Sequence, residues 1–165
     1  MAYMDSDGRY RKYGTEQAVP TTGGDFAIDG PTRQIEVDIL LSSLTTSPVI
    51  QADTTFVPAG VFIESVEVIA TTPAAGGTSF SVGLVGYDRT TVASNTGFVS
   101  ALVLASVDGQ GERTFLTQGV TSAGAYVGTT TPSAGYITAL AAGTFTGNGK
   151  VRIRINYRGV PPITY

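Results

Sequence analysis

The stretch TFVPAGVFIESVEVIATTPAAGGTSFSVGLVGYD, residues 55–88, decides the fold class. Residues 61–71 are β-branched and apolar on one face and carry polar side chains on the other. Further along, Phe80, Val82 and Leu84 alternate with serine and glycine. A period of two residues is typical of a strand that buries one face. The stretch therefore predicts two core strands joined by a loop rich in alanine and glycine.

Turn and bulge signals interrupt this stretch. Val-Pro-Ala-Gly at 57–60 predicts a turn, because proline fixes φ and glycine accepts conformations that other residues avoid. The alternation slips at residues 63–65, which predicts a β-bulge. The loop at 72–77 is too long for a two-residue hairpin.

Two strands further out in the chain repeat the alternation more cleanly. The apolar positions predicted to face the core are Ile35, Val37, Ile39 and Leu41 in residues 34–41, and Val151, Ile153, Ile155 and Tyr157 in residues 150–158. The first strand carries Glu36 and Asp38 on its other face, and the second carries a basic row that includes Arg152 and Arg154. If the two strands are neighbours, these charges pair across the sheet. If they are not, the basic row is available to an acidic partner.

The remaining segments are shorter. Strands are predicted at residues 49–51, 112–117, 136–140 and 143–146, loops at 89–96 and over most of 118–135, a brief extended piece at 125–127, and a Gly-Asn-Gly turn at 147–149. Residues 98–107 fit either a short buried strand or a short helix. Leucine and alanine dominate their middle, which favours the helix.

The pattern as a whole predicts an all-β fold. Eight or nine short strands with regular turn signals are typical of an antiparallel β-sandwich, and we expect it to be jelly-roll-like. Residues 1–32 show no helix or strand period and are predicted to form an extended N-terminal arm. Residues 33–158 form the predicted β-sandwich domain, and 159–165 a C-terminal tail in which two prolines cannot continue a sheet.

The arm combines tyrosines with basic residues, which are frequent contact residues at protein interfaces. The candidate interface residues are Tyr3, Arg9, Tyr10, Arg11, Lys12 and Tyr13 in the arm and Arg152 and Arg154 in the last strand. The alternative is a disordered tail. A phosphate site is disfavoured, because acidic residues flank the short basic run.

The composition excludes several kinds of chemistry. The 165 residues contain no histidine and no cysteine, which rules out histidine-dependent catalytic triads, thiolate metal sites and disulfides. No calcium-loop or phosphate-loop spacing is present. We therefore predict no catalytic residue, no cofactor and no metal, and we expect that the protein is not an enzyme.

Charge and hydropathy limit the partners. The net charge is −3, which argues against binding nucleic acid, since that requires clustered lysine and arginine. No apolar run approaches the roughly 20 residues that span a bilayer, and residues 1–14 lack the apolar core of a secretory signal. Only 14% of the residues are charged, against about 25% in ordinary domains. We expect a protein that is made in the cytoplasm, binds no membrane and has a largely neutral surface suited to packing against neighbours.

Four tyrosines of the domain have two interpretations. Tyr87, Tyr126, Tyr136 and Tyr157 could stack against sugars. We favour core or sheet-face positions for them, because tyrosine is common in strands.

Several short motifs resemble those of a known family. They are Val-Pro-Ala-Gly at 57–60 with the following strand, Gly-Phe-Val at 97–99, Ala-Tyr-Val-Gly at 125–128, Tyr-Ile-Thr-Ala at 136–139, Phe-Thr at 145–146 and Gly-Lys-Val-Arg-Ile at 149–153. Together they resemble small β-sandwich capsid decoration, or cement, proteins of tailed bacteriophages. The resemblance extends over residues 34–158 and consists of turns and strand ends.

This resemblance implies a non-enzymatic virion protein that binds the outer surface of the capsid and stabilises the shell. Its implied partners are the major capsid protein and other copies of itself, as a homotrimer on the capsid surface. The resemblance transfers no binding residue. The alternatives are another virion component, such as a head-fibre base, neck or tail protein, and, less favoured, a carbohydrate-binding module.

Overall fold

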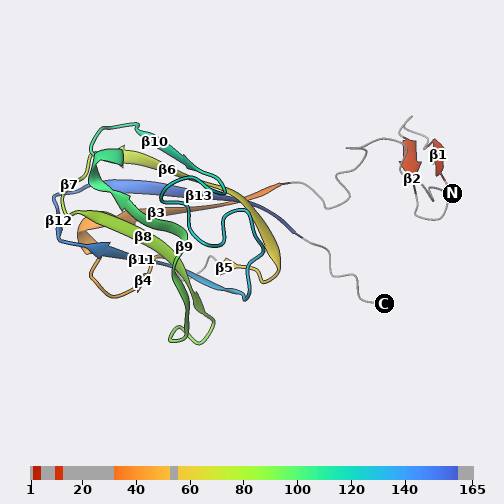
Figure 1. Ribbon diagram of the computed structural model, residues 1–165, viewed down its shortest axis with the longest axis horizontal. Helices are drawn as coiled ribbons and strands as arrows, with labels where there is room; N and C mark the ends of the chain where they lie inside the picture. Colours follow the sequence, from red (N-terminus) through yellow and green to blue (C-terminus); the bar gives the residue numbers. More distant parts are fainter. Residues whose placement is uncertain (1, 5–9, 13–31, 53–55, 160–165) are drawn as a thin grey trace.

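The two strands predicted from the 55–88 stretch form, but they do not pair with each other. In the computed structural model, which describes residues 32–52 and 56–159 and the backbone of 2–4 and 10–12, they are β6 (Val61–Thr72) and β8 (Ser79–Gly86). They lie in opposite sheets of a sandwich, so the loop between them crosses from one layer to the other (Figure 1). Residues 53–55 lie outside the described residues.

Eight main strands build the two layers. The other six are β3 (Arg33–Leu40), β4 (Val49–Ile50), β9 (Val92–Val103), β10 (Arg113–Leu116), β11 (Gly135–Ala142) and β13 (Lys150–Gly159). One sheet has the order β10-β6-β13-β3, and the other has the order β4-β11-β8-β9. Counted along the chain, these are strands 6-3-8-1 and 2-7-4-5, all antiparallel, which is the strand order of a jelly roll. The predicted fold class is confirmed.

Smaller elements complete the fold. β5 (Phe56–Val57) pairs with β11, and β7 (Ala75–Gly76) pairs with β12 (Phe145–Thr146). Two single 3-10 turns, at Leu41–Ser43 and Leu104–Ser106, are the only helical elements among the described residues. β1 (Ala2–Met4) and β2 (Tyr10–Lys12) form an antiparallel pair, so the prediction of no strand in residues 1–32 is wrong at these six positions.

The cleanest predictions from periodicity are confirmed. β3 and β13 are neighbours over eight consecutive pairs, from Leu40 opposite Lys150 to Arg33 opposite Tyr157. Every apolar position predicted to face the core in these two strands is buried. The predicted bulge is present in β6, where Glu64 is the extra residue opposite β13. The turn at 57–60 also forms, with Gly60 at φ +68.

The loop predicted at residues 89–96 is wrong from Val92 onward, and of the two alternatives for 98–107 the strand is confirmed over 98–103 and the favoured helix is wrong. β9 occupies residues predicted as loop, and the favoured helix at 98–107 is a strand followed by one 3-10 turn. Phe98, Val99 and Leu102 are buried in the core against β8. Repeated register shifts along β9 break the period of two, and Ala101 even has a φ of +49. Residues 98–107 therefore form a largely apolar run without a clear period, from which helix and strand cannot be distinguished.

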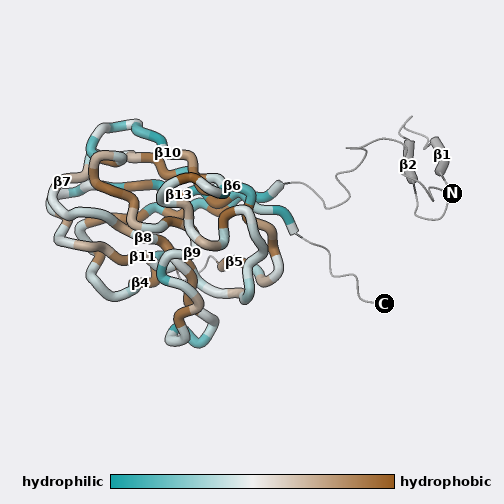
Figure 2. Tube along the Cα trace, in the orientation of Figure 1, coloured by the Kyte–Doolittle hydropathy of each residue, from teal (hydrophilic) through white to brown (hydrophobic). Residues whose placement is uncertain are grey.

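The core lies between the two sheets and consists mainly of aliphatic and aromatic side chains. Its largest fully buried side chains include Phe80, Phe98, Ile63, Leu116 and Ile153. Figure 2 shows brown, apolar tube along the strands of both layers and mostly pale tube in the loops between them. The apolar faces of both sheets are therefore buried inside the sandwich. The two outer faces are on the side of solvent or of a partner.

Candidate interaction surfaces

The described residues hold no group of three or more carboxylate, imidazole or thiol side chains that could bind a metal. No helix in the described part of the chain is long and apolar enough to cross a bilayer. Each of the two sheets presents an outer face on the side away from the core.

The outer face of β10-β6-β13-β3, called here the charged face, carries rows of ionic side chains. One cross-strand row runs Arg113, Ile69, Arg152 and Asp38, and the next runs Phe115, Glu67, Arg154 and Glu36. Because side chains alternate along a strand, these residues point away from the core when their neighbours point into it. Opposite charges consequently lie beside each other on adjacent strands.

Glu67 lies at the centre of the charged face. Its side chain is only 8% exposed, and it lies 3.2 Å from the Arg113 guanidinium and 3.4 Å from that of Arg154. Arg154 also donates a 2.7 Å hydrogen bond to Glu36. A buried carboxylate requires such partners, since desolvation disfavours an unpaired charge. Two arginines and two glutamates thus form one connected chain across four strands.

A second ion pair lies nearer the other end of β13. The Arg152 guanidinium donates two hydrogen bonds to the Asp38 carboxylate, at 2.7 and 3.0 Å. These hydrogen bonds, with the positive charges of Arg152 and Lys150, hold the pKa of Asp38 below its usual value. The prediction that adjacent strands pair these charges is therefore confirmed, and the alternative of an unpartnered basic row is not.

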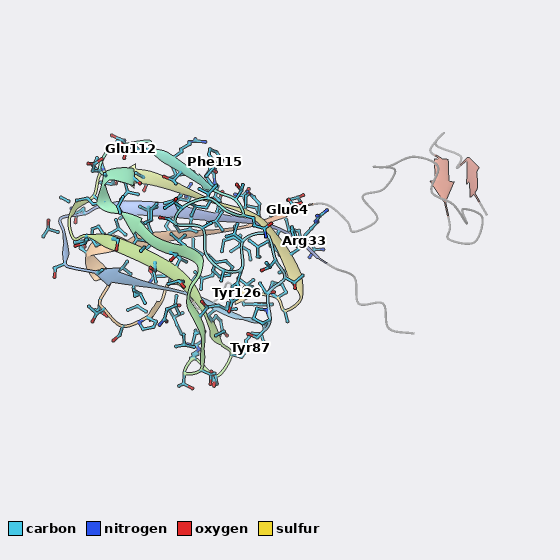
Figure 3. All side chains as sticks on the ribbon, viewed as in Figure 1. Arg33, Glu64, Tyr87, Glu112, Phe115 and Tyr126 are labelled. Carbon is cyan, nitrogen blue, oxygen red and sulfur yellow. The ribbon has the colours of Figure 1, made fainter. Side chains whose placement is uncertain are left out.

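The charged face ends near the first residues of β3. There Arg158 lies 3.4 Å from Glu64, and its guanidinium lies 5.0 Å from the centre of the Phe62 ring. Figure 3 labels Glu64 on β6 and Arg33 on β3 toward this end of the sheet. Four arginines and four carboxylates on the face are therefore matched by contacts within the chain.

The outer face of β4-β11-β8-β9, called here the uncharged face, has a different chemistry. Its cross-strand rows are Phe56, Tyr136, Val85 and Val92; Ile50, Thr138 and Gly83; Leu140 and Ser81; and Ala142, Ser79 and Val103. None of these positions is Asp, Glu, Lys or Arg.

The middle of the uncharged face is shielded by β9. A Cβ atom at Gly83 would lie 2.0 Å from the Ser94 carbonyl oxygen, so β9 crosses there in van der Waals contact. The N–H of Ala101 donates a 2.9 Å hydrogen bond to Ser81 Oγ. The accessible apolar side chains of this face therefore lie toward its two ends, with Phe56 and Val92 at one end and Val103 at the other.

An aromatic cluster, defined as Phe56, Tyr87 and Tyr136, occupies one end of the uncharged face. The Tyr87 ring lies edge-on to Phe56, with centroids 5.8 Å apart, and to Tyr136, at 5.9 Å. The Arg89 guanidinium lies 5.0 Å from the Tyr136 ring centre. Phe56 and Tyr87 remain 47% and 55% exposed, so the cluster is ordered by its own contacts yet presented to the outside.

The turn that follows β8 positions Tyr87. Asp88 Oδ1 accepts hydrogen bonds from the N–H groups of Thr90, at 3.0 Å, and Thr91, at 2.9 Å, and Oδ2 accepts one from the Thr91 hydroxyl. These bonds, led by that of the hydroxyl, hold the pKa of Asp88 well below its usual range. The Asp88 carboxylate therefore stabilises the turn through hydrogen bonds on both of its oxygens.

The other tyrosines divide between the two interpretations. Tyr126 and Tyr157 are buried in the core, which confirms the prediction for them. Tyr126 packs edge-on against Phe98, with centroids 5.7 Å apart, and burial raises the pKa of its hydroxyl. Tyr136 is half-buried on the sheet face, whereas Tyr87 lies outside the core.

The candidate interface residues lie in different parts of the chain. Arg152 and Arg154 lie on the charged face in ion pairs within the chain, and their contact with a partner stays a prediction. Tyr3, Tyr10, Arg11 and Lys12 lie in β1 and β2, where Tyr3 is the backbone partner of Arg11. Arg9 and Tyr13 lie outside the described residues.

The uncharged face was not predicted, although the sequence carries a signal for it. Residues 68–87, 90–107 and 114–149 contain no charged side chain. The charges of the sandwich are confined to a few short segments between them. Only the topology shows that the charge-bearing strands β3, β6, β10 and β13 all belong to one sheet.

Comparison with known proteins shows likeness at the level of structure. No family model and no curated protein matches the sequence. A chain in the acidic stable capsid structure of Helicobacter pylori bacteriophage KHP30 matches at a TM-score of 0.54 and 16% identity, covering 82% of this chain and 95% of that one.

Two further capsid structures give similar matches. A chain in the capsid of Ralstonia phage GP4 has a TM-score of 0.52 and 15% identity, over 86% of this chain and 89% of its own. A chain in the capsid asymmetric unit of cyanophage Pam1 has the same TM-score and identity, over 87% and 95%. At this identity the matches establish the fold, an antiparallel β-sandwich that this chain shares with chains found in phage capsids.

Proposed function

We propose that this chain is a non-enzymatic structural protein of a bacteriophage virion, which binds the outer surface of the capsid and stabilises the shell as a decoration protein. One observation carries the proposal. The fold is shared along nearly the whole length of chains in phage capsid structures, with 89–95% of those chains covered.

Three properties of the chain support a structural role. Motifs along residues 34–158 resemble those of decoration proteins. The ionic side chains of the charged face are matched within the chain. The second outer face is uncharged, which suits burial against protein, since no charge there has to be desolvated.

The proposed partners are the major capsid protein and further copies of this chain, with a homotrimer as the expected unit. Residues 1–32 act as an arm toward a neighbour, through Tyr3, Arg9, Tyr10, Arg11, Lys12 and Tyr13. A head-fibre base, neck or tail protein has the same requirements of fold and surface, and it is the alternative role.

Exposed aromatic rings favour a carbohydrate-binding role to a limited extent. Tyr87 is accessible, as a sugar platform requires. Sugar recognition also needs polar groups beside the ring to meet the hydroxyls. The carboxylate of the neighbouring Asp88 is already used within its turn. The structural role is therefore the better supported one.

The proposal is tested on the phage that encodes the chain. Purified particles are analysed by mass spectrometry and labelled with gold-conjugated antibody against the sandwich domain. We expect labelling over the outside of the heads, and we expect heads from a deletion mutant to release DNA at a lower temperature than wild-type heads. Labelling confined to tails would support the alternative role, and absence from particles would contradict both.

A further inference from the structure

We infer that the uncharged face is an interaction surface for a second copy of this chain, with Phe56, Tyr87, Tyr136 and Val92 as its anchor. This inference adds to the proposed function the surface through which copies associate. It is a property of the purified chain and is measured without a capsid.

The first argument is the contrast between the two outer faces. Burying the charged face would desolvate several ion pairs, including the carboxylate of Glu67 with its two arginines. The rows of the uncharged face contain no ionic group. The charges beside its aromatic end are Asp88 and Arg89, which are opposite in sign and lie on the exposed turn after β8. Of the two sheets, the one formed by β4, β11, β8 and β9 therefore has the lower cost of burial.

The second argument is electrostatic and identifies the occupant. In a symmetric assembly, residues next to the symmetry axis meet their own counterparts, so any charge there opposes an identical charge. The chain carries a net charge of −3, so two copies repel each other at long range, and a contact surface without charged side chains adds nothing to that repulsion. An uncharged face is complementary to itself, whatever the order of the axis.

The third argument is the distribution of exposed apolar groups. Of the large hydrophobic side chains that are exposed among the described residues, Phe56, Tyr87, Val92 and Val103 belong to the uncharged face or its end. Leu40 and Phe115 lie instead on strands of the charged face, and Val120 lies in the loop after β10. Aromatic anchors with fixed rotamers favour association, because little side-chain freedom is lost on contact.

The aromatic cluster is also pre-organised. Tyr87 is fixed by edge-on contacts to two rings and by the hydrogen-bonded turn at Asp88. Tyr136 carries the Arg89 guanidinium at 5.0 Å from its ring centre. A cluster held in this way contacts a partner without rearrangement, which distinguishes it from apolar side chains on a loop.

The experiment compares full-length variants by sedimentation equilibrium over a range of protein concentrations. Tyr87→Lys and Val92→Lys each place a charge on the proposed contact. Phe115→Lys is the matched control, because Phe115 is 60% exposed and lies on the other outer face. Thermal unfolding followed by circular dichroism shows whether each variant remains folded, as expected for exposed positions.

We expect the wild-type chain and Phe115→Lys to associate, and Tyr87→Lys and Val92→Lys to be monomers with a wild-type melting temperature. Association of the wild type should persist at about 1 M salt, where the Debye length is about 3 Å and exposed ion pairs are screened. Dissociation by salt would contradict a contact through an uncharged face.

Other outcomes overturn the inference directly. They are a wild-type chain that is monomeric at every concentration, and a Tyr87→Lys variant that associates as the wild type does. Glycan binding by a monomeric wild type that is lost in Tyr87→Lys would also overturn it and would assign the cluster to sugar. None of these results contradicts the proposed function, which is decided by the labelling of phage heads.

Discussion

At the scale of single residues, two glycines allow β9 to approach its neighbours closely. A Cβ atom at Gly83 would lie 2.0 Å from the Ser94 carbonyl oxygen. A Cβ atom at Gly97 would lie 2.4 Å from the Tyr126 ring. Neither glycine has a positive φ, so both are required by space and not by backbone conformation. The sequence shows the glycines, but it cannot show what approaches them.

Replacing Gly83 tests this close approach. We expect Gly83→Ala to lower the free energy of unfolding by about 1–3 kcal/mol, because the obstacle is backbone and cannot move as a side chain can. Chemical denaturation measures the change. Gly159→Ala is the control, since a Cβ there meets no atom within 4 Å, and its expected effect is within about 0.5 kcal/mol. Equal effects of the two changes would refute the packing of β9 on Gly83.

At the scale of secondary-structure elements, the strands that pair regularly are the ones that the sequence predicts correctly. β3 and β13 pair without a register shift between them, so their side chains keep a strict alternation and their boundaries are predictable to within a residue or two. β9 has register shifts against β8, and its buried residues follow no simple period. The interpretation of residues 98–107 as helix failed for that reason. Bulges are visible in a sequence only where the rest of the strand is regular, as in β6.

The ion pairs of the charged face should contribute unequally to the free energy of unfolding. Arg154 contacts both Glu36 and the nearly buried Glu67, whereas the Arg152–Asp38 pair is largely exposed. Arg154→Glu would place three carboxylates together, and we expect a loss of about 2–4 kcal/mol in the free energy of unfolding. Arg152→Glu should cost about 1 kcal/mol or less, because exposed pairs contribute little.

Urea denaturation of the two single variants measures this difference. A Glu36→Arg change added to Arg154→Glu should recover part of the loss, since it restores an opposite charge at the 2.7 Å contact. If Arg154→Glu and Arg152→Glu lowered the free energy of unfolding equally, the burial of Glu67 would not determine the loss. If the double variant recovered none of the loss, the contact between residues 36 and 154 would not contribute to it.

At the scale of the whole molecule, the sequence could not predict which strands belong to which sheet. The 55–88 stretch predicts two neighbouring core strands, yet β6 and β8 are placed in opposite layers by pairing with residues far away in the chain. The uncharged face depends on this division, because it exists only when the charge-bearing strands gather in one sheet. Local patterns thus predicted the class of fold, whereas the candidate surface required the topology.

Removing residues 1–31 tests the division into arm and domain. Every core residue belongs to residues 35–157, so we expect the shortened chain to keep the wild-type melting temperature within a few degrees. We expect its binding to phage heads to weaken, measured by cosedimentation with heads from a deletion mutant. Loss of the folded state on shortening would contradict the division into arm and domain. Unchanged binding to heads would show that the arm does not contact the shell.

The position of β13 has a consequence for how the protein is made. β13 is the last strand among the described residues, yet it lies inside its sheet, between β3 and β6. Until the ribosome has released this strand, β3 and β6 lack their shared partner, and the core lacks Val151, Ile153 and Ile155. The sandwich therefore closes only after β13 has been synthesised, and folding then proceeds on the millisecond to second scale of all-β proteins. A product truncated before β13 cannot close the sandwich, so incomplete subunits are excluded from assembly by their own failure to fold.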